Sequence, residues 1–392
     1  MYTKVLLIIF VSLIASNLFA TSELQDKKFF TVAPYIIVED QGKLTLNFEL
    51  SKDRKLDIQI SSKSISVKTQ KISGLWLSSK LNKIALGTLK CGEGIRYQFI
   101  SKFGKTIDNS LYSIPCEENK SLYFGFMSDT QIKNRFGQSR ANELSATVAV
   151  IKKSYPLSLI INAGDIVQNG GQEAEWTNFF NTASIYLSNS YLMAAVGNHE
   201  YYDAPTQDKA PPQFLKYMRN NDDENLGYMQ LDLGKINLLM LNSNFNFMSE
   251  SKIQEQWDWL EKKLINAEKF HKPTIIIMHH SPFSSSLEHV REIPTRLRND
   301  LVPMLEKYKS VKMVISGHLH MYERSIKNGI TYLIAGPSGG INNTITYKNP
   351  FSVFIKSLTT TFSVFNVTQD QIKVKTFDGS NKIVEEFETS LK

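Results

Sequence analysis

Residues 311–320 read VKMVISGHLH, an apolar stretch that leads directly into Gly317, His318 and His320. A short run of apolar and β-branched residues closed by glycine is typical of a buried β-strand. We expect the strand to span residues 311–316 and to present two imidazoles at its carboxyl end. Because imidazole is the commonest metal ligand in proteins, this stretch predicts a metal-binding sheet edge.

The same arrangement recurs elsewhere in the chain. Apolar stretches are followed by polar residues at 122–127 with Asp129, at 157–162 with Asp165, at 191–196 with Asn198 and His199, and at 274–278 with His279 and His280. Helical patterns at 141–153, 173–187, 253–270 and 297–308 separate them, so the sequence predicts a layered α/β domain. The carboxyl ends of strands line the ligand crevice in such domains, and we expect these side chains to meet there.

The residue types at these strand ends suit divalent metal ions. Five of the seven histidines lie there, namely His199, His279, His280, His318 and His320. Imidazole and carboxylate together bind zinc, iron and manganese. Two aspartates, one asparagine and three histidines exceed the needs of one ion, so we expect two divalent ions (Fe, Zn or Mn) that share a carboxylate. Such a pair supplies its own nucleophile from water, and no catalytic serine or cysteine is required.

The ordered series Asp129, Gly164-Asp165, Gly197-Asn198-His199-Glu200, His279 and Gly317-His318-Leu319-His320 resembles the calcineurin-like metallophosphoesterases. The continuation Met321-Tyr322-Glu323-Arg324 is similar to the purple acid phosphatase branch. The resemblance covers about residues 29–385. It implies a four-layer αββα sandwich at residues 120–385, preceded by an all-β sandwich domain.

The resemblance also implies a role for each residue. Asp165 would bridge both ions. Asp129 and His320 would hold the first ion, and Asn198, His279 and His318 would hold the second. His199 would face the substrate, stabilise the phosphoryl charge and protonate the leaving group, which makes His199 and Asp165 the expected catalytic residues. The implied activity is acid phosphatase-like hydrolysis of phosphate monoesters by attack of metal-bound hydroxide.

Two positions depart from the family pattern. Purple acid phosphatases have a metal-binding tyrosine three residues after the bridging aspartate, where this chain has Gln168. The wider family has histidine two residues after the first aspartate, where this chain has Gln131. Since the first ion then lacks an anionic phenolate, we expect two divalent ions and a colourless enzyme. Of the adjacent His279 and His280 we expect the first to be the ligand, with His280 behind it or in contact with substrate.

Two other functions are compatible with these motifs. The same site in a phosphodiesterase or nucleotide hydrolase would differ only in the loops that contact substrate. A catalytically inactive surface-binding module is the third hypothesis, and the complete ligand set together with His199 argues against it.

Residues 29–117 have a different pattern. Alternation of apolar and polar residues at 44–50, 56–60 and 95–99, separated by short polar turns, predicts a β-sandwich of the immunoglobulin or fibronectin III kind. Cys91 and Cys116, the two cysteines of the chain, both fall in this region. A disulfide between them is compatible with export, but sequence spacing does not establish that their Cα atoms are close enough.

The amino terminus and the overall charge bear on location and partners. Lys4, an apolar run at 5–14 and a small residue at Ala20 predict a signal peptide at residues 1–20 and a secreted or periplasmic protein with no membrane span after cleavage. The net charge of +7 suits an anionic, phosphorylated small-molecule substrate. No run of like charges stands out, so we expect no nucleic-acid partner. The sequence leaves the oligomeric state open.

Overall fold

The computed structural model describes residues 29–62, 70–77, 80–89, 94–100, 106–113, 121–131, 141–219, 226–340 and 343–392 of the 392-residue chain. The expected signal peptide and both cysteines lie outside the described residues. Among the helices of the described part, none is long and apolar enough to cross a membrane.

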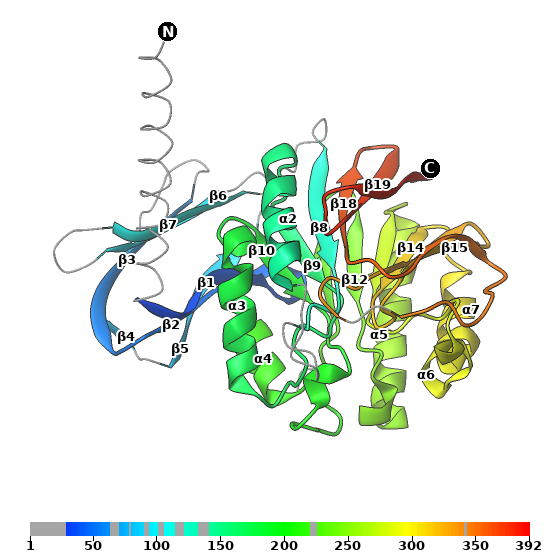
Figure 1. Ribbon diagram of the computed structural model, residues 1–392, viewed down its shortest axis with the longest axis horizontal. Coiled ribbons are helices and arrows are strands. Elements are labelled where there is room, and N and C mark those ends of the chain that lie inside the picture. Colours follow the sequence, from blue (N-terminus) through cyan, green and yellow to red (C-terminus); the bar gives the residue numbers. More distant parts are fainter. Residues whose placement is uncertain are drawn as a thin grey trace, which may run out of the picture.

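Two large sheets form the centre of the molecule (Figure 1). In the described part of the chain the first has nine strands, in the order β20 (Ile383–Ser390), β19 (Gln371–Asp378), β18 (Thr361–Val367), β8 (Leu122–Met127), β9 (Leu159–Asn162), β10 (Tyr191–Ala194), β1 (Phe30–Val38), β2 (Lys43–Leu50) and β5 (Leu81–Thr88). The second has seven, in the order β11 (Met229–Asp232), β12 (Asn237–Met240), β13 (Thr274–Ile277), β14 (Val311–Ser316), β16 (Ile330–Ala335), β15 (Tyr322–Lys327) and β17 (Ser352–Lys356).

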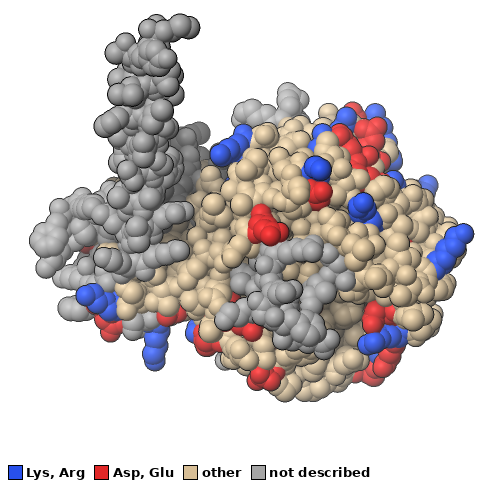
Figure 2. All heavy atoms as spheres, in the orientation of Figure 1, with Lys and Arg blue, Asp and Glu red and all other residues tan. Residues whose placement is uncertain are grey.

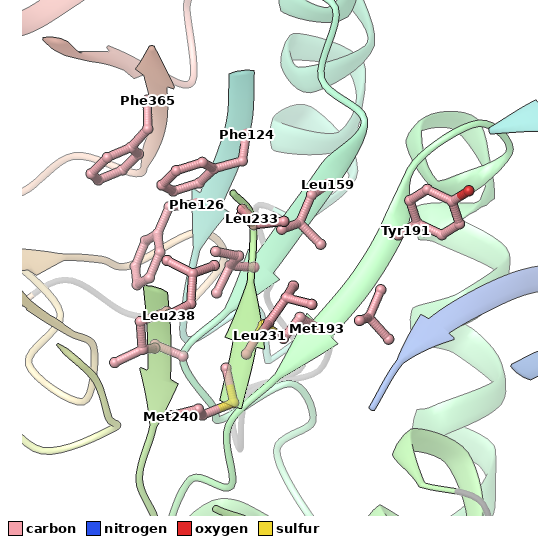
Figure 3. Close-up of a cluster of buried hydrophobic side chains, with 14 of the residues drawn as sticks. Phe124, Phe126, Leu159, Tyr191, Met193, Leu231, Leu233, Leu238, Met240 and Phe365 are labelled. Atoms are coloured by element: carbon pink, nitrogen blue, oxygen red, sulfur yellow. The ribbon is translucent and has the colours of Figure 1, made fainter. Parts of the chain in front are cut away.

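The two sheets pack face to face through a continuous apolar core. Inward-facing side chains of β8, β9 and β10 meet those of β11 and β12, as Figure 3 shows for Phe124, Leu159, Met193, Leu238 and Met240. Strands β8, β9 and β10 are parallel to one another, and so are β12, β13 and β14. Parallel strands are buried on both faces, which is why their sequences are continuous apolar runs.

Helices cover the outer face of each sheet. On the nine-stranded sheet lie α2 (Ala141–Ser154), α3 (Glu173–Leu187) and α4 (Pro212–Met218), whose buried residues form one cluster with outward-facing strand residues. On the seven-stranded sheet lie α5 (Glu250–Lys269), α6 (Glu292–Arg296), the π-helical η5 (Leu297–Leu301) and α7 (Val302–Leu305). The layers run helix, sheet, sheet, helix, which confirms a mixed, layered α/β fold.

The amino-terminal strands are less separate than expected. Strands β4 (Gln70–Leu77), β3 (Arg54–Ser62), β6 (Gly94–Ile100) and β7 (Thr106–Ser113) form a sheet that packs on β1 and β2, with the ring of Phe99 4.8 Å from that of Phe48. The facing sheet is not self-contained, because β1 pairs in parallel with β10 at Ile37 and Leu192. The expected independent all-β domain is therefore not confirmed, and the domain boundary near residue 117 stays a prediction.

The physical reason for this continuity lies in β1. Its residues are almost all buried, and Tyr35 stacks on Phe180 of α3 with ring centroids 3.8 Å apart. A strand that is apolar on both faces cannot remain at a solvated sandwich edge, so it pairs with the free edge of β10.

On the face in Figure 2, basic and acidic side chains are interspersed over the described surface.

Candidate metal centre

All of the expected ligands lie at the carboxyl ends of parallel strands, where the two sheets meet. Asp129 follows β8, Asp165 follows β9 and Asn198 follows β10, whereas His279 follows β13 and His318 follows β14. The sheets are tied together at this point: the His279 Nδ1–H donates to the Ala163 carbonyl oxygen at 2.8 Å. The site is thus built from both sheets, on rigid backbone.

One group of ligand atoms converges on Asn198. Its Oδ1 atom lies 3.0 Å from His279 Nε2 and 2.9 Å from His318 Nδ1. His279 Nε2 is also 3.3 Å from Asp165 Oδ1. The structure therefore brings together the three residues expected at the second ion, with Asp165 beside them.

The other group lies around Asp129. His320 Nε2 is 3.5 Å from Asp129 Oδ1, and Asp129 is completely buried. The Gln131 carboxamide donates to Asp165 Oδ2 at 3.4 Å. Asp129, Asp165 and His279 form a group whose ligand atoms lie within 4.8 Å of one another, so the two groups share Asp165.

These residues fit a pair of divalent ions. Ligand atoms about 2.1 Å from a common ion lie roughly 3.0–3.5 Å from one another, which is the range that Asn198, His279 and Asp165 show. The tautomer of His279 also suits a metal ligand. Because its Nδ1 is engaged by a carbonyl oxygen, Nε2 is the atom that faces the other ligands.

Charge is concentrated at this point. Burial works to raise the pKa of Asp165, but the imidazoles of His279 and His199 lower it well below its ordinary value. Burial also works to lower the pKa of His279, but the charge of Asp165 raises it to about 9. Burial together with His279 lowers the pKa of His318 to about 3, so its ring is neutral and its lone pair is available to a metal.

His280 takes a different place from His279. Its Nδ1 lies 2.9 Å from the Ser243 hydroxyl, and its ring lies 4.3 Å from that of His318. Burial, followed by the neighbouring His318, lowers its pKa well below the ordinary value. His279, His280 and His318 also form a compact group, but only His279 among the adjacent pair contacts Asn198 and Asp165.

His199 lies at the open side of the site. Its side chain is 17% exposed, whereas that of His279 is completely buried. The Nε2 atom is 3.8 Å from Asp165 Oδ2, and the His199 backbone N–H donates to Asp165 Oδ1 at 2.9 Å. The ring of Tyr202 lies 4.4 Å from the imidazole.

Glu200 is a structural residue of the site to which sequence analysis assigned no role. It is completely buried, and its carboxylate accepts from the backbone N–H groups of Asp165, Ile166 and Gly197 at 2.9, 2.8 and 2.7 Å. Burial and the charge of Asp165 raise the pKa of Glu200 to about 8, whereas these donors favour the carboxylate. The only sequence signal for it was its position in Gly-Asn-His-Glu.

The close approach of two strand ends explains why the Gly-Asn-His-Glu motif begins with glycine. A Cβ atom on Gly197 would lie 2.2 Å from both the backbone nitrogen and Oδ1 of Asp165. No side chain fits there, so the loops after β9 and β10 can meet only with glycine at this position.

The profile described as calcineurin-like phosphoesterase matches residues 122–322, from the first strand of the site to the residues just after His320. The chain belongs to this family.

Relatives of this chain include plant purple acid phosphatases. Purple acid phosphatase 21 of Arabidopsis thaliana is 26% identical over 180 residues, which are 44% of this chain and 39% of the relative. A probable glycerophosphodiester phosphodiesterase of Arcobacter nitrofigilis is 27% identical over 220 residues, covering 53% of this chain and 76% of the relative. The chain spans 39% and 53% of the lengths of the first two plant relatives.

Similarity of fold extends further than similarity of sequence. The structure of a purple acid phosphatase from yellow lupin (Lupinus luteus) seeds superposes with a TM-score of 0.72 over 91% of this chain and 74% of that chain, at 16% identity. The shared fold includes the amino-terminal strands as well as the two large sheets, because the match covers more of the chain than residues 122–322 do.

Proposed function

We propose that this phosphoesterase is a metal-dependent, acid phosphatase-like hydrolase of phosphate monoesters. The observation that carries the proposal is the convergence of six ligand side chains from five strand ends on one point, with His199 beside them. Similarity to purple acid phosphatases supports the same activity.

Two divalent ions, of Fe, Zn or Mn, would be held by the two groups around Asp165. Asp129, Asp165 and His320 would hold the first ion, with the Gln131 carboxamide adjacent. Asn198, His279, His318 and Asp165 would hold the second. When bound, such a pair activates water and neutralises the charge of a phosphoryl group.

The chain's own residues then orient and protonate the substrate. His199 stands at the exposed side of the ligands, where its Nε2 would contact a phosphoryl oxygen and hold the proton that the leaving alkoxide needs. Tyr202, whose ring is tilted at 47° to that of His199 and which is 45% exposed, would contact the leaving group. Buried Asp129, Asp165 and His279 exclude bulk water from the other side.

A phosphodiester substrate is the second candidate. It is favoured by the Arcobacter relative, which is named a probable glycerophosphodiester phosphodiesterase and of which this chain spans 76%. The ligand set is the same for both substrate classes, so loop contacts such as those of Tyr202 would decide between them. Export, with a signal peptide at residues 1–20 and a secreted or periplasmic location, remains part of the proposal.

The test combines metal analysis with turnover. Purified protein is assayed for metal content and then for hydrolysis of para-nitrophenyl phosphate, bis-para-nitrophenyl phosphate and nucleotides. We expect two ions per chain and the highest kcat/KM for the monoester; a preference for the diester would select the second candidate. Protein with neither metal nor turnover would refute the proposal and indicate a binding module.

Two variants test the assigned roles. Asp165→Asn should fold but lose bound metal and at least about a hundredfold in kcat, because it removes the shared anionic ligand. His199→Ala should keep both ions and lose roughly 10²–10⁴ in kcat. Wild-type turnover with full metal content in either variant would contradict the assigned mechanism.

A further inference from the structure

Lysines collect at one edge of the seven-stranded sheet. Three segments meet there, at residues 232–236, 261–273 and 306–312, because they lead into the neighbouring parallel strands β12, β13 and β14. Backbone contacts join them; the Thr274 N–H, for example, donates to the Ser310 carbonyl oxygen at 2.8 Å. The metal ligands follow the carboxyl ends of β13 and β14, so this surface, which we call the basic edge, lies at the opposite end of the strands.

The basic edge holds more than half of the net charge of the chain. Its 25 residues contain eight lysines and four acidic residues, a net charge of +4 out of +7. The lysines are Lys235, Lys262, Lys263, Lys269, Lys272, Lys307, Lys309 and Lys312. They come from segments that are far apart in the sequence, so the positive surface exists only in the folded chain. Such a surface attracts anionic partners.

Acidic residues of the basic edge are engaged by other groups of the protein. Asp232 pairs with Lys272, and Glu306 pairs with Lys327, which comes from β15. The carboxylate of Glu268 accepts the backbone N–H that precedes β14 at 2.8 Å. These carboxylates therefore serve internal contacts, while the exposed lysines of α5 and of the segment before β14 face solvent.

Apolar side chains are exposed among these lysines. Phe270, at the end of α5, is 64% exposed, and Lys269 Nζ lies 5.4 Å from the centre of its ring. Ile265 is 55% exposed and follows Lys262 by three residues and precedes Lys269 by four, so these three side chains share one face of the helix. Lysines beside exposed aromatic and aliphatic side chains are typical of surfaces that bind at a membrane interface.

We propose that the basic edge docks this protein on an anionic lipid bilayer, with Phe270 inserted among the headgroups and the lysines beside the lipid phosphates. Each lysine near such a surface raises the binding constant about fivefold. A soluble polyanion would use the lysines alone, whereas the exposed Phe270 and Ile265 favour a bilayer. The metal centre lies at the opposite end of the strands and would stay open to solution. The inference does not depend on the proposed function.

The first test is sedimentation of the full chain with lipid vesicles. Vesicles of phosphatidylcholine alone are compared with vesicles of equal parts phosphatidylcholine and phosphatidylglycerol. We expect at least about tenfold tighter binding to the anionic vesicles, and loss of this difference at high salt. The neutral vesicles register any contribution of the apolar segment at 5–14. Equal binding to both kinds of vesicle would overturn the inference.

A charge variant locates the bound surface. Lys262→Gln, Lys307→Gln and Lys309→Gln are combined, because these lysines are exposed and form no ion pair within the described part of the chain. Binding to anionic vesicles should fall about a hundredfold, from about fivefold for each lysine. The matched control removes the same charge from three exposed lysines outside the basic edge, Lys348, Lys356 and Lys382. The control should bind within about threefold of the wild type, and equal losses in both triple variants would overturn the inference.

The substitution Phe270→Ser separates a bilayer from a soluble polyanion. Loss of the inserted ring should weaken binding to anionic vesicles about tenfold and leave retention on heparin unchanged. Heparin retention together with wild-type vesicle binding in this variant would replace the bilayer by a soluble polyanion. All substituted side chains are exposed, so thermal unfolding of each variant should match the wild type. If a variant does not fold, the comparison of neutral and anionic vesicles with the wild type still decides.

Discussion

Gly340 offers a test of the first ion site by steric means alone. A Cβ atom at this position would lie 2.5 Å from His320 Cε1, 2.6 Å from Gln131 Oε1 and 2.9 Å from His320 Nδ1. The backbone of Gly340 does not have a positive φ, so alanine is conformationally acceptable there. The substitution Gly340→Ala therefore acts on the two neighbouring side chains and not on the backbone.

The size of the effect follows from these distances. To reach an ordinary van der Waals contact of 3.4 Å, His320 Cε1 must move by about 0.9 Å from 2.5 Å. Main-chain movement is opposed by the Gly340 N–H, which donates to the Asp129 carbonyl oxygen at 2.9 Å. A displacement of about 1 Å at a catalytic centre costs on the order of a hundredfold in rate.

We expect Gly340→Ala to retain one ion per chain, at the second site, and to lose about a hundredfold in kcat. Metal per chain, turnover of an aryl phosphate and thermal unfolding are measured together. Gly329→Ala is the control: its Cβ would meet nothing within 4 Å, and its φ of +80° should cost about 1 kcal/mol of stability without affecting metal or turnover. Two bound ions and near wild-type kcat in Gly340→Ala would refute the assignment of His320.

Three further predictions concern the metals and the core. His279→Ala should lose the second ion, whereas His280→Ala should retain both because its Nδ1 bonds Ser243; metal content of each variant decides this. The metal-loaded wild type should show no strong visible charge-transfer band, because Gln168 occupies the position at which purple acid phosphatases have a metal-binding tyrosine. A purple protein would contradict this. Leu260→Ala, at a completely buried position of α5, should lower the free energy of unfolding by about 2–5 kcal/mol in a denaturant titration, and a change below about 1 kcal/mol would contradict the packing.

Most elements of the α/β part could be predicted because their apolar periodicity is local. Helix α3 and strand β14 have the expected bounds, 173–187 and 311–316. The expected single helix at 297–308 instead begins at Glu292 and passes through the π-helical η5 before α7. Pro303 lacks a backbone N–H and interrupts the regular α-helical ladder there, an effect that the apolar pattern alone did not reveal.

Strands of mixed composition could not be predicted from the sequence. Strand β15 begins two residues after His320 and contains Glu323 and Arg324, whose charges are not typical of a buried strand. Their charges are accommodated by distant partners: Glu323 accepts from Ser285, and Arg324 pairs with Glu385 at 2.7 Å. Such a strand is identified only when the residues that neutralise it are known.

By itself the sequence identified the candidate ligands and their order, because an apolar run and the polar residue that ends it are neighbours in the chain. Tertiary structure alone decided how they meet. The contact of His279 with Asn198 joins two sheets, the pairing of β1 with β10 joins the amino-terminal strands to the nine-stranded sheet, and Gln168 contacts His199. These arrangements depend on which strand ends lie side by side, and distance along the chain carries no information about that.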